Sequence, residues 1–330
     1  MAEYKGIKGF RVQSLASDPS PGVEGQVWYN TTTNLLKYTA QTAAWVSGGN
    51  MNTVRTDGSG FGPLLAAQGQ GGASASPTVF TNNTEQYDGT SWTEVNNMLV
   101  ARRGLAAVGT QTAGIAFSGD APGGTETSST ENWDGTSWTE VNNQIATGVG
   151  RAPIGTVSTA ALAVGFPYGN PPNARTEEYD GTSWSEVGDL NNGRGLNKQS
   201  AGTTTAGLVF SGDNHPASPR DTFDCEEYNG TAWTEVNNVI NERRDGAGVG
   251  TQTAAVGFGG NSNTVNPVPE SEEYDGTSWS NTSSSPAAPR LNIFSNCGGV
   301  SNAALQCTGA LTNTVEEYAL GPTTKTVTVS

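Results

Sequence analysis

The chain has 330 residues, a formal net charge of −15, 44 glycines and only 34% hydrophobic residues. The excess of acidic residues argues against a nucleic-acid partner, because neutralising phosphates requires a basic surface. No apolar run reaches the roughly 20 residues of a membrane-spanning helix, and the first residues do not read as a signal peptide, so no membrane insertion is expected.

Residues 1–25 differ from the rest of the chain. Lys5, Lys8 and Arg11 form a basic cluster, and Asp18-Pro-Ser-Pro-Gly22 has the composition of a linker. We interpret residues 1–25 as an extension that docks the protein to its partners. The remainder, residues 26–330, is expected to form one repeating domain.

Residues 26–48 contain three strand-like segments, Gln26–Tyr29, Leu35–Tyr38 and Ala43–Val46. The stretches between them, 30–34 and 39–42, are rich in threonine and predict turns. This region either supplies a strand to the repeats that follow or forms a separate β-meander.

The motif Tyr-Asp-Gly-Thr-Ser-Trp, first complete at residues 87–92, recurs along the chain with small changes. Self-similarity at a period of roughly 40 to 50 residues indicates a repeat architecture. Because a position repeated in every unit is a scaffold position, we expect the closing tryptophans to pack between units rather than to bind a sugar. They recur at nearly even spacing and are Trp45, Trp92, Trp138, Trp184, Trp233 and Trp279.

Each repeat divides into four short strands. In the second repeat, residues 104–108 and 113–117 form the first two strands, and the third ends at Trp133. Asp134-Gly-Thr-Ser137 then turns the chain into the fourth strand, because glycine supplies the positive φ of a tight hairpin. Four strands per unit of about 46 residues is the size of a β-propeller blade. We find no helical apolar spacing, so an all-β fold is predicted.

The spacing within the repeats separates fixed connections from variable ones. The glycine between the first two strands follows the tryptophan at a nearly constant interval, as Gly109 follows Trp92. The connection between the second and third strands differs in length from repeat to repeat. Variation confined to one connection indicates a free surface loop. In a propeller these loops share one face with the links between blades, and this loop face is the candidate binding surface.

These residues resemble the kelch-type β-propeller. Gly259-Gly260 is similar to the kelch double glycine, and Tyr274 and Trp279 are similar to its paired aromatic residues. The resemblance covers roughly residues 50–318, although most units have Ser-Gly or Tyr-Gly in place of Gly-Gly. It implies four-stranded blades around an axis.

A second resemblance concerns the source of such a chain. Residues 23–32 look like a segment of bacteriophage tail-fibre and appendage proteins, and the repeats resemble kelch-like virion proteins of marine phages. This resemblance implies a structural or host-attachment role in the virion, with synthesis in the host cytoplasm.

Six segments have the pattern of a second strand, which predicts six four-stranded antiparallel blades: near Leu64–Ala67, Ile115–Phe117, Ala161–Phe166, Leu208–Phe210, Ala255–Phe258 and Ala304–Cys307. The last unit ends at Tyr318 without a tryptophan, so the orphan strand at Trp45 could complete it and remove an open sheet edge. Residues 324–330 could be that strand instead. A seventh blade, built from residues 26–48 and the C-terminal tail, is the alternative.

Basic residues are scarce, yet every unit has an arginine soon after its tryptophan. One interpretation is that these arginines bond to neighbouring carbonyls or to the Glu-Glu pairs. The other is a ring at the channel mouth that binds an anionic group through forked guanidinium contacts. Where Arg102/Arg103 and Arg243/Arg244 are paired, we assign the second to the ring. The candidates are Arg55, Arg103, Arg151, Arg194, Arg244 and Arg290.

The sequence offers little chemistry. His215 is the only histidine, so a Ser-His-Asp triad or a histidine-based metal site is not expected. We predict no catalytic residues, metal or cofactor. The alternative of a glycan-active enzyme would use loop carboxylates such as Asp213, Asp221 or Asp224.

The sequence therefore predicts a non-enzymatic virion protein. Its expected partners are other virion proteins through residues 1–25, a host-surface glycan at the loop face, and further copies of itself in the particle. Besides the enzyme, an adaptor that binds acidic peptides through the arginine ring remains an alternative.

Overall fold

The computed structural model describes residues 12–23, 25–74, 79–166, 173–196, 198–214, 220–282, 286, 303–309 and 312–327. Regular structure within these ranges consists of β-strands. The described part of the chain holds no helix that could span a membrane. The chain divides into two compact units, one formed by Met1–Ala44 with Ala319–Ser330 and the other by Trp45–Tyr318.

The first unit is built on β1 (Gln13–Leu15), β2 (Val27–Asn30) and the start of β3 (Leu35–Ser47). β1 pairs with β2 in parallel and β2 with β3 in antiparallel register. The carboxylate of Asp18 accepts hydrogen bonds from the side chains of Trp28, Asn30 and Lys37. These contacts tie residues 27–38 to the segment before them.

β3 corrects the prediction of a turn at Thr39–Thr42. The strand runs without interruption through these residues. The stretch contains no glycine, proline, asparagine or aspartate, and its threonines are β-branched residues that favour strands. Polar composition alone was therefore a poor turn signal.

The described part of the second unit contains five four-stranded antiparallel sheets, each formed by the strands of one repeat. In each sheet the Asp-Gly or Asn-Gly turn joins the last two strands, so Tyr87 lies opposite Trp92 and Tyr274 opposite Trp279. The strands are β4 (Ser59–Phe61), β5 (Gln68–Gln70), β6 (Thr84–Tyr87) and β7 (Trp92–Val95); β8 (Ala106–Thr110), β9 (Ala113–Phe117), β12 (Thr130–Trp133) and β13 (Trp138–Val141); β14 (Ala152–Val157), β15 (Ala160–Phe166), β16 (Asn173–Tyr179) and β17 (Trp184–Glu186); β18 (Ser200–Thr203), β19 (Ala206–Phe210), β20 (Cys225–Tyr228) and β21 (Trp233–Val236); and β22 (Ala247–Thr251), β23 (Ala254–Phe258), β24 (Glu272–Tyr274) and β25 (Trp279–Asn281). A small hairpin of β10 (Asp120–Ala121) and β11 (Thr125–Glu126) lies between β9 and β12.

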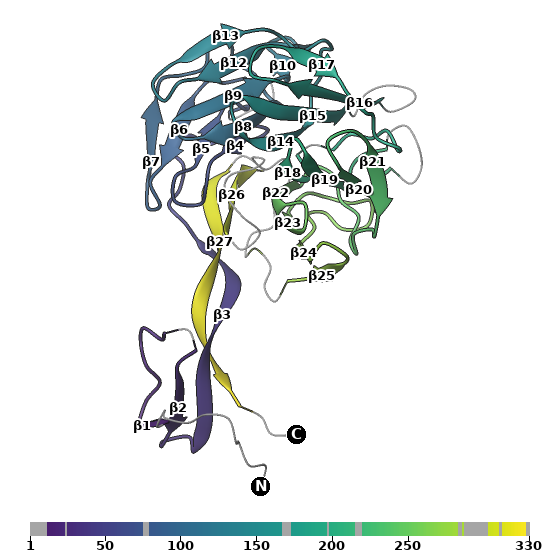
Figure 1. Cartoon of the computed structure of the whole chain (residues 1–330). Coiled ribbons are helices and arrows are strands. Elements are labelled where there is room, and N and C mark those ends of the chain that lie inside the picture. Colours follow the sequence, from purple (N-terminus) through teal and green to yellow (C-terminus); the bar gives the residue numbers. More distant parts are fainter. Residues whose placement is uncertain are drawn as a thin grey trace. The chain divides into compact units, whose positions relative to one another are not determined.

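The first strands of neighbouring sheets, β4, β8, β14, β18 and β22, lie side by side within this unit (Figure 1). Their backbones approach closely: a Cβ atom added at Gly248 of β22 would lie 2.8 Å from the carbonyl oxygen of Ser200 in β18. This close packing of the first strands therefore requires glycine at such positions. The result is an all-β, propeller-like arrangement.

Hydrogen bonds at a repeated position join the first four of these sheets, each to the next. The indole N–H of Trp138 donates to the hydroxyl of Thr84 in the preceding sheet, over 3.2 Å. The same bond joins Trp184 to Thr130 and Trp233 to Thr176. The tryptophans at the start of the fourth strands are all buried: Trp92, Trp138, Trp184, Trp233 and Trp279. They pack against protein and offer no open platform to a sugar.

A further sheet has the order β1-β2-β3-β27-β26, with β26 at Ala303–Gly309 and β27 at Thr312–Thr326. At the β3–β27 pairing, the ring of Trp45 lies 5.2 Å from that of Tyr318. The indole N–H of Trp45 donates to Ser271 at 3.1 Å. Trp138, Trp184 and Trp233 likewise each pack against an aromatic ring of the neighbouring strand and donate a hydrogen bond to a hydroxyl group. The surroundings of Trp45 therefore match theirs.

Five of the six predicted second strands fall within β9, β15, β19, β23 and β26. The first was misplaced, because residues 64–67 belong to the connection and β5 begins at Gln68. Gln70 ends β5, where four of the other second strands have phenylalanine. Gln70 is fully buried, and neither of its side-chain polar atoms has a hydrogen-bond partner.

We expect Gln70→Leu to raise the free energy of unfolding by about 1 kcal/mol, because it removes an unsatisfied amide from the core. Gln68→Leu is the comparison, because the buried Gln68 accepts a hydrogen bond from Gln86 and only its Nε2 has no partner, so this change should gain less stability than Gln70→Leu. Denaturant unfolding measures both variants. Equal losses for both would contradict the prediction.

Candidate functional site

Each link between neighbouring sheets that the structure describes is anchored by a buried arginine–glutamate ion pair. Arg102 Nη2 donates to Glu131 Oε1 at 2.8 Å, and its Nη1 donates to the carbonyl oxygens of Ser118 and Ser129. Glu131 Oε2 also accepts the backbone N–H of Leu99 at 2.7 Å, so one carboxylate fixes the arginine and the link. The pairs are Arg55–Glu85 (3.0 Å), Arg102–Glu131 (2.8 Å), Arg151–Glu177 (3.3 Å), Arg194–Glu226 (2.5 Å) and Arg243–Glu272 (2.7 Å).

Three arginines of the predicted anion-binding ring belong to these pairs. Arg55, Arg151 and Arg194 are at most 1% exposed. A buried guanidinium group has no surface that a ligand could contact. The prediction that these three arginines bind an anion is therefore wrong. They follow the other interpretation, in which the arginines bond to neighbouring groups of the protein.

Arg103 and Arg244 are partly exposed and form ion pairs of their own, with Asp120 at 3.5 Å and Asp221 at 2.5 Å. Arg290 lies outside the described residues. At two of the links the buried arginine is Arg102 or Arg243, whereas the sequence analysis chose the adjacent Arg103 and Arg244. The signal was available: Arg102 and Arg243 stand at the same interval after their tryptophans as Arg55 and Arg194 do.

A cluster of charges that the sequence analysis missed lies where the first strands begin. The three residues are Asp57, Lys198 and Asp245, which lie two residues before the start of β4, β18 and β22, respectively. Lys198 is 4% exposed, and its ammonium donates to the carbonyl oxygen of Gly58. Burial raises the pKa of Asp57, and burial with the charge of Asp57 raises the pKa of Asp245 to about 6.

The raised pKa of Asp245 predicts that the stability of the protein depends on pH. A carboxyl group with a raised pKa binds its proton more tightly in the folded state, so Asp245 makes the protein less stable as the pH rises from about 4 to 6. Asp245→Asn should therefore raise the free energy of unfolding at pH 7.5 by on the order of 1–2 kcal/mol and change it little at pH 4. Asparagine also tolerates the φ of 56° at this position.

Urea unfolding at both pH values tests this prediction, with Asp275→Asn as the control. Asn229 already fills the equivalent turn position and accepts the same two backbone hydrogen bonds, so the control should change stability by less than about 0.5 kcal/mol. An equal loss of stability at both pH values in Asp245→Asn would contradict the assignment.

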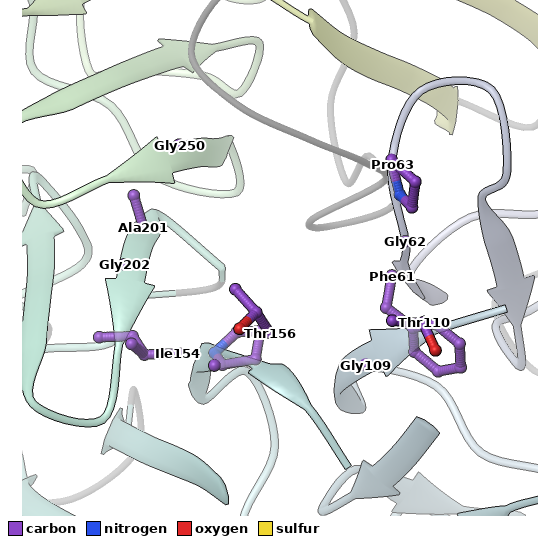
Figure 2. Close-up of a pocket in the computed structure, with 12 residues that line it drawn as sticks. Phe61, Gly62, Pro63, Gly109, Thr110, Ile154, Thr156, Ala201, Gly202 and Gly250 are labelled. Atoms are coloured by element: carbon purple, nitrogen blue, oxygen red, sulfur yellow. The ribbon is translucent and has the colours of Figure 1, made fainter. Parts of the chain in front are cut away.

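The other ends of the first strands surround a cavity of about 240 Å³. Figure 2 shows Phe61 and Thr110 across the cavity from Ala201. Gly109 has a φ of 135°, and a Cβ atom there would lie 2.4 Å from the carbonyl oxygen of Ala113, so this glycine is required by its own turn. The described residues that line this cavity carry no titratable side chain and so supply no acid or base for catalysis.

The links between sheets also present apolar side chains to solvent. Leu99, Ile145 and Ile240 each follow the tryptophan of their unit by seven residues and are 58%, 58% and 48% exposed. Their backbone N–H groups are held by the glutamates of the buried ion pairs. The backbone is therefore fixed while the side chains are available for contact.

Within the described ranges, no group of three His, Cys, Asp or Glu side chains could hold a metal ion. His215 lies outside them. Comparisons of the sequence with protein-family models and with curated proteins find no match.

Proposed function

We propose that the second unit is a six-bladed kelch-like propeller, closed by the end of β3 as the fourth strand of the last blade. The support lies in contacts that repeat those between the other sheets. The Tyr87 hydroxyl donates to Glu317, as that of Tyr274 does to Glu227. The backbone N–H of Gly48 donates to the carbonyl oxygen of Val315 at 3.0 Å.

We further propose that the protein is a non-enzymatic virion component of a bacteriophage, in the tail fibre or another appendage. Its loop face would bind another virion protein or a host-surface glycan, and residues 1–25 would dock it to the particle. The observation that carries the proposal is the contrast between the buried ion pairs, which repeat in every described link, and the connections, which vary in length. A rigid frame lowers the entropic cost of presenting such loops to a partner.

Binding assays on the purified protein test this proposal, with surface polysaccharides and the other proteins of the particle as ligands. We expect saturable binding without release of sugar. Leu99→Asp and Ile145→Asp should abolish it, whereas Leu65→Asp, at an exposed leucine in the connection between β4 and β5, should not. Release of sugar would favour the glycan-active enzyme, and equal loss in all three variants would exclude the loop face.

A further inference from the structure

A groove lies between the fourth and fifth sheets, beside their shared link. Its walls come from Phe223 just before β20, Ile240 and Glu242 in the link, and Val265 and Glu270 in the connection from β23 to β24. Its volume is about 240 Å³. The groove therefore opens on the face that carries the variable connections.

Three large apolar side chains in this groove are exposed. Phe223, Ile240 and Val265 are 41%, 48% and 44% exposed, and Val268 beneath them is 2% exposed. Isolated exposed apolar residues are ordinary, but three that line one concave site are typical of a contact surface. The groove can take an apolar side chain of a partner.

The charge of the groove is negative. Glu242 and Glu270 are among its lining residues, and none of the described lining residues is basic. Two nearby arginines are already paired, Arg243 with Glu272 and Arg244 with Asp221. Partial burial and the neighbouring Asp221 raise the pKa of Glu242 against the opposing effect of Arg244, and a further cation placed here would favour its charged form.

The walls are fixed by backbone hydrogen bonds. The N–H of Ile240 donates to Glu272 at 2.8 Å, and that of Val239 donates to the carbonyl oxygen of Phe223 at 3.1 Å. On the opposite wall the N–H of Val268 donates to the carbonyl oxygen of Gly260 at 2.9 Å. A partner would meet a preformed site and would not have to order it.

We propose that this groove binds a peptide segment of a partner protein in which a lysine or arginine stands next to a large apolar side chain. The apolar side chain packs on Phe223, Ile240 and Val265, and the cation pairs with Glu242 and Glu270. This inference deepens the proposed binding role. It can fail while that role stands, because a partner or glycan bound elsewhere on the loop face would not respond to changes in the groove.

The test uses the full chain and the synthetic hexapeptide Gly-Phe-Lys-Leu-Arg-Gly, with binding followed by calorimetry or fluorescence anisotropy. We expect a Kd of about 10–500 μM that weakens with added salt. Phe223→Ser should weaken binding at least about tenfold, and the double variant Glu242→Gln/Glu270→Gln should weaken it and reduce the salt dependence.

Two matched controls locate the site. Leu65→Ser removes an exposed apolar side chain elsewhere, and Glu140→Gln removes an exposed carboxylate, so both should leave Kd within about twofold. Gly-Phe-Gln-Leu-Gln-Gly and Gly-Ser-Lys-Ser-Arg-Gly should each bind more weakly than the parent peptide. The proposal is overturned if the parent peptide shows no saturable binding up to about 1 mM, or if the groove variants bind as the wild type does.

Discussion

Glu131→Ala is expected to lower the free energy of unfolding by about 3–5 kcal/mol, because it leaves the charge of Arg102 buried without its partner. The change also removes the acceptor of the Leu99 N–H and so releases the backbone of the link. Burial already lowers the pKa of Arg102, which shows how poorly this position tolerates a charge on its own. Denaturant unfolding followed by circular dichroism measures the loss.

The matched control is Glu140→Ala, because Glu140 lies directly opposite Glu131 across the β12–β13 pairing but is exposed. It should change stability by less than about 0.5 kcal/mol. The double variant Arg102→Met/Glu131→Met should lose less than Glu131→Ala, since no buried charge is left behind. Similar losses in Glu131→Ala and Glu140→Ala would show that the ion pair does not hold the link.

The repeated turns made most of the sheet architecture predictable. An Asp-Gly or Asn-Gly pair shortly before each tryptophan-led strand is a local signal, because positive φ is needed at the glycine whatever the rest of the chain does. Gly89 and Gly135 have φ values of 91° and 94°. The four strands per repeat follow from such local signals.

Features that depend on distant parts of the chain were not predictable in the same way. β3 continues through Thr39–Thr42 beside β27, a strand that lies far away in the sequence. The role of the arginines was also undetermined, because the same side chain in the same repeat serves a ring or a buried pair equally well. Only the burial of Glu85 and its equivalents decides between these roles.

The prediction that Arg103 and Arg244, rather than Arg102 and Arg243, are the repeated arginines was wrong because burial cannot be read from residue type alone. Two adjacent arginines are equivalent in composition, but adjacent residues project to different sides of the backbone. Arg102 is fully buried, whereas the Arg103 side chain is 32% exposed. The recurring interval between tryptophan and arginine was the better guide, because packing fixes the length of the link.

Trp45→Ala is expected to lower the stability of the second unit by about 3–5 kcal/mol, since it removes a large ring packed against Tyr318 and Phe258. Val46→Ala is the control, because Val46 is the next residue of β3 and is 52% exposed. Scanning calorimetry and unfolding kinetics measure both variants. If β3 completes the last sheet, Trp45→Ala should be as damaging as Trp92→Ala, whose tryptophan belongs to a sheet of contiguous chain.

Trp45→Ala should also accelerate unfolding, because of the chain length that its contacts span. The bond from Trp45 to Ser271 joins residues 226 positions apart, and the bond from Tyr87 to Glu317 joins residues 230 apart. Ordering so long a loop costs entropy that only the closing contacts offset. Once they weaken, the last sheet can separate before the others unfold. A variant that unfolds no faster than Val46→Ala would place the stabilising contacts inside the individual sheets and would refute closure through β3.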